Sequence, residues 1–254
     1  MININLKIKI LLLSALAFLF VFPCMGDDLY VAVAANFTGP MQQLSPLFKN
    51  RSGHQIIGSY GTVGKFFAQI KNEAPFEVFI SSDDTTPKRL VKEGLAISES
   101  QFTYAIGKLV LYSVQPGRVD GNGNILRQGG FKRLVIANPK MAVYGAAAVE
   151  AMKRMGVYEQ LQPKLIIGEN ITQAYQFVAS ENAELGFVSL SQIYFDGEYS
   201  AGSYWLLPCN LYPPLKQDAI LLTKGKNNPA ARAFLTFLKS QEARNIIRAY
   251  GYEN

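Results

Sequence analysis

The sequence predicts an α/β protein made of two lobes, and three observations support this prediction. Short apolar runs alternate with segments of helical periodicity, which is typical of parallel strands connected by crossover helices. The alternation stops in a glycine-rich stretch at 116–130 and then starts again. An extended segment at 102–114 precedes that stretch, and a Pro-Pro pair at 213–214 follows the second series. Two lobes connected by two extended crossings fit this order.

The first lobe is expected to comprise residues 27–106 and 218–254. Within the segment 40–49, Met41, Leu44 and Phe48 recur at the spacing of one helix face. Asp83 and Asp84 precede Pro87 in a pattern that favours a helix start rather than a catalytic carboxylate pair. The expected elements are strands at 29–35, 56–60, 78–81 and 219–223, helices at 40–49, 65–72 and 88–93, and two further helical patterns after residue 229.

The second lobe is expected at residues 107–217. Its elements are strands at 134–137, 165–167 and 185–190 and helices at 145–155 and 171–180. No internal repeat with a solenoid period is present in the sequence.

The first 26 residues have the pattern of a secretory signal peptide. Lys7 and Lys9 precede an apolar run at 10–22, and small residues follow Pro23. The apolar run is shorter than the roughly 20 residues that cross a bilayer. We therefore expect cleavage before Asp27 and a periplasmic protein, with lipidation at Cys24 as the alternative.

Composition excludes several classes of function. The net charge of +6 comes from scattered basic residues, which disfavours a nucleic-acid partner. The only histidine, His54, reads as part of a surface turn, so neither a histidine-rich zinc site nor an ordinary Ser-His-Asp triad is expected. Removal of the leader would leave Cys209 without an intramolecular partner. Its apolar neighbours suggest a packed or half-buried thiol.

Four strand ends lead into helix starts through turns of similar character. The turns lie at 33–40, 59–65, 137–146 and 168–174, two in each expected lobe. A helix start presents unpaired N–H groups and a partial positive charge, and open α/β sheets bind ligands at the carboxyl ends of strands. Turns that face one cleft can therefore surround a small oxyanion. Each turn alone is equally consistent with helix capping or tight backbone geometry.

At this point the chain resembles the molybdate-binding proteins of ATP-binding-cassette transporters over residues 28–252. The order and spacing of several segments carry the resemblance. These are VAVAANFTGPM at 31–41, GSYGTVGKFFAQI at 58–70, NEAPFEVFISSD at 72–83, AIGKLVLY at 105–112, IANPKMAVYGAAA at 136–148, GENITQA at 168–174 and ELGFVSLSQ at 184–192. The resemblance implies a type II periplasmic-binding-protein fold, no cofactor and no catalysis.

The resemblance also implies a set of ligand-binding residues. The polar ligand of the first turn falls on Asn36, whose side chain and backbone N–H can both donate. The serine of the second turn falls on Val63, which lacks a hydroxyl, so Thr62 is the candidate replacement. The third and fourth turns place Tyr144 and Ile171 as backbone donors. A pocket tyrosine found in some members falls on Ser189.

The expected function is therefore capture of molybdate, and of tungstate, by a monomer that closes on its ligand and docks on a membrane permease. No direct metal ligand is implied, because the oxyanion is held through its oxygens. A receptor for sulfate, phosphate or a sulfonate would belong to the same class of binding protein. An exported enzyme that uses carboxylates or a Ser-Lys pair would belong to a different class, and a sensory binding protein is a third possibility.

Overall fold

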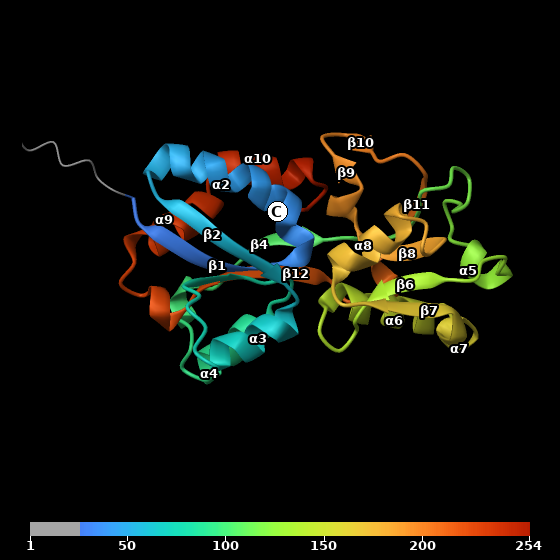
Figure 1. Cartoon of the computed structure of the whole chain (residues 1–254), viewed down its shortest axis with the longest axis horizontal. Helices are drawn as coiled ribbons and strands as arrows, with labels where there is room; N and C mark the ends of the chain where they lie inside the picture. Colours follow the sequence, from blue (N-terminus) through green and yellow to red (C-terminus); the bar gives the residue numbers. More distant parts are fainter. Residues whose placement is uncertain (1–25) are drawn as a thin grey trace, which may run out of the picture.

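Two five-stranded sheets lie next to each other in the computed structural model, which describes residues 26–254 (Figure 1). The α/β class expected from the sequence is confirmed. The predicted signal peptide, including Cys24, lies outside the described residues except for Gly26. Within residues 26–254, no helix combines the length and apolarity needed to span a membrane.

The first sheet combines the beginning and the end of the chain. From one edge to the other its strands are β2 (Gln55–Gly61), β1 (Asp28–Ala34), β3 (Val78–Ile80), β12 (Leu215–Leu221) and β4 (Phe102–Gly107). β1 pairs parallel with β2 and β3, whereas β12 pairs antiparallel with β3 and β4. The parallel pairs place the ends of β1, β2 and β3 at the same edge of this sheet.

Alternation along β1 explains why this sheet has helices on both faces. Leu29, Val31 and Val33 are buried in one apolar cluster, and Ala32 and Ala34 are buried in another, as the two-residue period of a strand requires. The first cluster packs against α2 (Thr38–Ser52), α9 (Pro229–Leu238) and α10 (Gln241–Ala249), and the second against α3 (Val63–Lys71) and α4 (Thr85–Lys92). Figure 1 shows these two groups of helices above and below the sheet.

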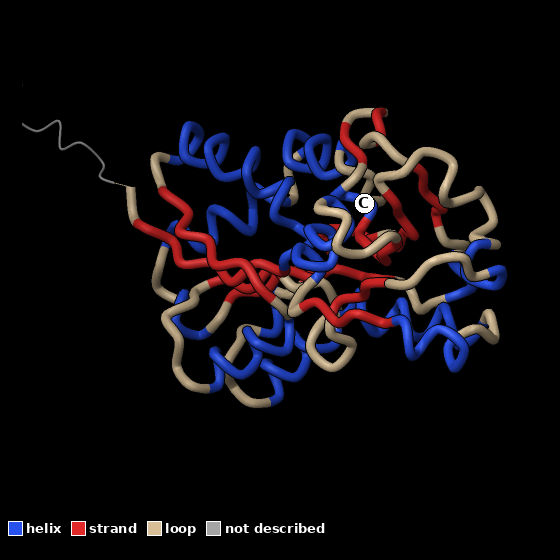
Figure 2. The backbone as a smooth tube through the Cα atoms, turned by 45° about the vertical axis from the view of Figure 1, so that its right-hand side comes forward, coloured by secondary structure: helices blue, strands red, loops and turns tan. Residues whose placement is uncertain are grey.

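The second sheet is built from the middle of the chain. Its strands are, in order, β11 (Ser203–Leu206), β5 (Leu109–Ser113), β8 (Leu185–Ser189), β6 (Leu134–Ala137) and β7 (Leu165–Gly168). The longer helices that pack on it are α6 (Val143–Arg154) and α8 (Ile171–Ala179). The short elements are α5 (Ile125–Gln128), α7 (Tyr158–Leu161), β9 (Tyr194–Phe195) and β10 (Glu198–Tyr199). Figure 2 shows the strands running through the middle of the molecule, with helices on either side.

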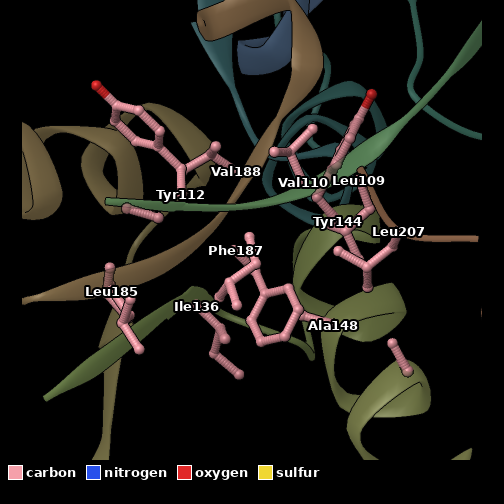
Figure 3. Packing of buried hydrophobic residues seen from close by; sticks show 14 of the residues in the cluster. Leu109, Val110, Tyr112, Ile136, Tyr144, Ala148, Leu185, Phe187, Val188 and Leu207 are labelled. Atoms are coloured by element: carbon pink, nitrogen blue, oxygen red, sulfur yellow. The ribbon is translucent and has the colours of Figure 1, made fainter. Parts of the chain in front are cut away.

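One apolar cluster forms the core of this second unit. Figure 3 shows part of it, with the Tyr144 ring close to Leu109 and Leu207. We call the first sheet with its helices lobe 1 and the second sheet with its helices lobe 2. The sequence places the lobe boundaries at 106/107 and 217/218, whereas β4 ends at Gly107 and β12 begins at Leu215.

The two crossings between the lobes run next to each other. Gly107 ends β4, and β5 begins two residues later in the other sheet. On the return crossing, Leu215 begins β12 and pairs directly with Gly107. A Cβ atom at Gly107 would lie 2.1 Å from the Tyr144 hydroxyl and 2.5 Å from Gln217 Nε2. The crossing therefore has no room for a side chain.

We expect Gly107→Ala to lower the free energy of unfolding by about 1–3 kcal/mol, the usual cost of overpacking a filled interior. Urea denaturation of both proteins measures this difference. Gly121→Ala is the matched control, because a Cβ atom there meets no atom within 4 Å. Equal stabilities of the two variants would contradict the proposed crowding at the crossing.

Candidate functional site

A small pocket lies between the lobes where strands of both sheets lead into helices. Lobe 1 contributes the ends of β1, β2 and β3, and lobe 2 contributes the starts of α6 and α8. The residues that line the pocket are Ala35, Asn36, Gly61, Thr62, Val63, Ser82, Ala142, Val143, Tyr144, Asn170 and Ile171. The expected meeting of four turns at one place is therefore present in the structure.

Thr62 gives the start of α3 a cap and keeps a proton to donate. The Lys65 amide donates to Thr62 Oγ1 over 3.3 Å, which caps the helix. A hydroxyl oxygen can accept such a bond while its own O–H donates elsewhere. The Val63 amide follows in the same turn, and it has no acceptor among the described residues. The turn therefore offers both an amide and a hydroxyl to a ligand.

The start of α6 is uncapped. Ala142, the residue before this helix, provides no side-chain hydrogen bond within the described structure. The helix begins tightly against β6, because a Cβ at Gly145 would lie 2.1 Å from the Ala137 carbonyl oxygen. The amides of Val143 and Tyr144 are thus held at the pocket without an intrahelical acceptor. A buried N–H without a partner costs about 1–3 kcal/mol, so this position favours an acceptor from a ligand.

The start of α8 is capped by Asn170. Its Oδ1 accepts from the Gln173 amide over 2.9 Å, while the Ile171 amide stays at the pocket. The Asn170 side-chain NH₂ group has no partner in residues 26–254, so it is a further available donor.

Among residues 26–254, the lining of the pocket carries no charged side chain. Within the described chain, none of its lining residues is Lys, Arg, His, Asp or Glu. Lys65, next to the pocket, is half-exposed and pairs with Glu169 over 3.3 Å. No group of His, Cys, Asp and Glu side chains suited to a metal ion occurs in residues 26–254. Helix-start amides and hydroxyls of this kind suit an oxyanion.

Five of the six site residues expected from the sequence line this pocket: Asn36, Thr62, Val63, Tyr144 and Ile171. The sixth, Ser189, lies behind them with no exposed surface. Its hydroxyl is 2.9 Å from the Ser191 hydroxyl, which in turn donates to the Asn36 carbonyl oxygen. Ser189 therefore belongs to the polar network that supports the pocket.

The Asn36 side chain is fixed by this network. Its Nδ2 donates to Gln217 Oε1 over 2.9 Å and to the Tyr252 hydroxyl over 2.8 Å, which uses both of its hydrogens. In this arrangement Asn36 has only its backbone amide left to donate to a ligand. Gln217 also connects the lobes, because its Nε2 donates to the Tyr144 hydroxyl over 3.1 Å.

Three tyrosine hydroxyls of the network are fully buried. Burial raises the pKa of Tyr104 and of Tyr144 well above the ordinary value, and it also raises the pKa of Tyr252. The hydrogen bonds of the Tyr144 and Tyr252 hydroxyls oppose this rise without cancelling it. The phenols are therefore neutral donors and acceptors at neutral pH.

Some functional residues were missed by reasoning from the sequence. Ser82 is 4% exposed, lines the pocket, and has no hydrogen-bond partner for its hydroxyl in the described part of the chain. It follows β3 closely, so the strand-end rule that identified the other turns applies to it as well. Asn170 was noted within its turn but not as a donor. Gln217 lies inside β12, and no local signal distinguishes it.

Three further predictions from the sequence concern residues outside the pocket. His54 lies in the turn between α2 and β2, as predicted. The helix start predicted after Asp83 and Asp84 is confirmed, because α4 begins at Thr85 with Asp84 in the N-cap position, and the Asp83 carboxylate accepts from the Thr86 amide over 2.8 Å. The prediction of a packed Cys209 was wrong, since this thiol is exposed. Leu207 is buried, but the chain leaves the sheet immediately afterwards, so Pro208 and Cys209 face solvent.

The profile of the family described as bacterial extracellular solute-binding protein matches residues 29–253. The chain belongs to this family. Molybdate-binding protein ModA of Azotobacter vinelandii is 54% identical over 225 residues, which cover 89% of each chain. Molybdate-binding protein ModA of Rhodobacter capsulatus is 49% identical over 230 residues, 91% of this chain and 90% of the relative.

Solved structures of solute-binding proteins share the fold. The periplasmic molybdate-binding protein of Azotobacter vinelandii matches with a TM-score of 0.86 and 38% identity, over 89% of this chain and 99% of that one. The sulfate-binding protein SubI of Mycobacterium tuberculosis matches with a TM-score of 0.69 and 13% identity, over 89% and 86% of the chains. This second likeness concerns the fold alone.

The buried tyrosines predict a loss of stability at alkaline pH. In the unfolded chain these phenols titrate near pH 10, whereas in the folded protein they hold their protons to higher pH. Above about pH 10 the unfolded state therefore binds fewer protons, and the free energy of unfolding falls as pH rises. Urea denaturation from pH 8 to 11 should show this decline, with a shallower slope in Tyr104→Phe. An identical slope in the variant would contradict the role of this phenol.

Proposed function

We propose that this protein captures molybdate in the pocket between its lobes and delivers it to a membrane ABC permease. The observation that carries the proposal is the set of unpaired amides at the starts of α3, α6 and α8, which face one pocket without a charged side chain among the lining residues described. The high identity to two molybdate-binding proteins supports molybdate as the oxyanion.

The proposed ligand shell combines backbone and hydroxyl donors. The amides of Val63, Tyr144 and Ile171 approach the anion from both lobes, and the hydroxyls of Thr62 and Ser82 donate from lobe 1. Hydrogen bonds to a charged group contribute roughly 1.5–3 kcal/mol each. Several of them offset the desolvation of the anion and the entropy lost on binding. Val63 contributes no hydroxyl, so Thr62 and Ser82 compensate for it.

Ligand contacts from both lobes favour a closed form, since an anion that binds two surfaces at once stabilises the state in which they meet. The proposal includes tungstate as a second ligand because its size and charge are close to those of molybdate. It also includes export to the periplasm with removal of residues 1–26, and action as a monomer. Binding and release require no covalent step, which fits a transport role.

Selectivity tests this proposal. Molybdate and tungstate have longer metal–oxygen bonds than the sulfur–oxygen bonds of sulfate, and amides fixed at helix starts cannot follow a smaller ion inward. We expect sulfate and phosphate to bind at least about a hundredfold more weakly than molybdate, which corresponds to losing one or two charged hydrogen bonds. Isothermal titration calorimetry on the purified protein measures this ratio. Preferred binding of sulfate would replace molybdate with sulfate as the proposed ligand.

Thr62 allows a matched pair of variants. Thr62→Val keeps the shape of the side chain but removes the hydroxyl, so we expect about tenfold weaker molybdate binding and about 1 kcal/mol lower stability from the lost cap. Thr62→Ser keeps the hydroxyl and should bind nearly as wild type. Calorimetry and urea denaturation separate the two effects. Unchanged affinity in Thr62→Val would remove this hydroxyl from the ligand shell.

A further inference from the structure

The lobes meet beside the pocket through the first turn of α3 and the turn before α6. The Gly64 amide of lobe 1 donates to the Met141 carbonyl oxygen of lobe 2 over 3.1 Å. The neighbouring amides of α3 have other roles, because that of Lys65 bonds to Thr62 and that of Val63 lies at the pocket. Gly64 therefore uses its amide to connect the lobes.

The same contact depends on the missing side chain of Gly64. A Cβ atom there would lie 3.0 Å from Met141 Cε, 3.1 Å from Met141 Sδ and 3.2 Å from Met141 Cα. The methionine side chain can move, but its Cα can retreat only if the turn of lobe 2 moves away. An added methyl group thus pushes directly against the second lobe.

The backbone conformation of lobe 1 does not require glycine at this position. Gly64 lies in the first turn of α3 and is not among the glycines with positive φ. An alanine in a helix is more favourable than a glycine by up to about 1 kcal/mol. Helix propensity therefore disfavours glycine at position 64. The close approach of Met141 in lobe 2 is the feature of the structure that favours it.

Other contacts between the lobes lie near this one. Lys65 pairs with Glu169 across the lobes over 3.3 Å, and the Thr172 hydroxyl donates to the Ala35 carbonyl oxygen over 3.3 Å. Val143 of lobe 2 packs against the apolar cluster of lobe 1 that contains α3 residues. The ion pair is exposed and contributes little. Gly64 and Met141 provide the close backbone approach.

We propose that Gly64 and Met141 form a closing latch whose tight approach sets how long the bound oxyanion is retained. Both are positioning residues, because neither lines the pocket. Their contact fixes the distance between the start of α3 and the start of α6, and both helix starts present amides to the pocket. This inference rests on the proposed function, since it assumes that the anion binds between these two helix starts.

The test is Gly64→Ala, for which stability and affinity should change in opposite directions. We expect an unchanged or higher melting temperature, because the helix gains a better residue. Molybdate should bind about 10- to 100-fold more weakly, which is the range expected for overpacking the closed contact. Stopped-flow measurement should place the loss in a faster dissociation rate, with the association rate nearly unchanged.

Met141→Ala provides the matched control and the rescue. Alone it keeps the backbone hydrogen bond and should bind molybdate within about threefold of wild type. In the double variant with Gly64→Ala it removes the two side-chain contacts and should recover part of the lost affinity.

The outcomes separate the latch from the proposed function. Absence of molybdate binding in the wild type overturns the proposed function. Binding by the wild type with an unchanged dissociation rate in Gly64→Ala overturns the latch alone. A lower melting temperature in Gly64→Ala, without rescue by Met141→Ala, also overturns the latch, because it assigns the glycine to the folding of lobe 1.

Discussion

Amide groups without acceptors at three helix starts are the constraint on which the rest of this molecule depends. α3, α6 and α8 all begin at the pocket, and each brings N–H groups that its own helix cannot satisfy. Thr62 and Asn170 satisfy later amides of α3 and α8, while α6 has no cap within the described chain. The need for an acceptor is therefore greatest where Val143 and Tyr144 lie, on the lobe opposite Asn36.

A second polar system holds these donors in place from behind. Gln217 lies on β12 beside the crossing. Its side-chain Oε1 accepts from Asn36 Nδ2 and the Tyr104 hydroxyl of lobe 1, and its Nε2 donates to the Tyr144 hydroxyl of lobe 2. One fully buried side chain thus connects both halves of the pocket. Because a buried group with a lost partner is costly, the network favours one relative position of the lobes. Gly107 leaves the space that this arrangement occupies.

The sequence predicted the order of the main strands and helices because their apolar periodicity is strong. β1 alternates between two cores, and α3 and α8 begin at recognisable caps. β9 and β10 were missed, since strands of two residues have too little pattern. β11 was missed because it is an edge strand in a loop-rich stretch and is defined only by its pairing with β5. The pocket turns followed from the strand-end rule. Gln217 did not, because its partners at 36, 104 and 144 are brought together only by the fold.

In the proposed function, the helix-start amides, the network around Gln217 and the Gly64–Met141 contact have different roles in binding an anion. The network around Gln217 lies next to the crossings and orients the donors of both lobes. Gly64 and Met141 lie beside the pocket at a direct contact between the lobes, so in the proposed latch their contact responds to closure. In the proposed mode of binding, neutral dipoles hold the anion, so no ion pair with the ligand has to be broken when the lobes separate. The same proposal makes release depend on the separation of the lobes, which allows one site to serve both capture and delivery.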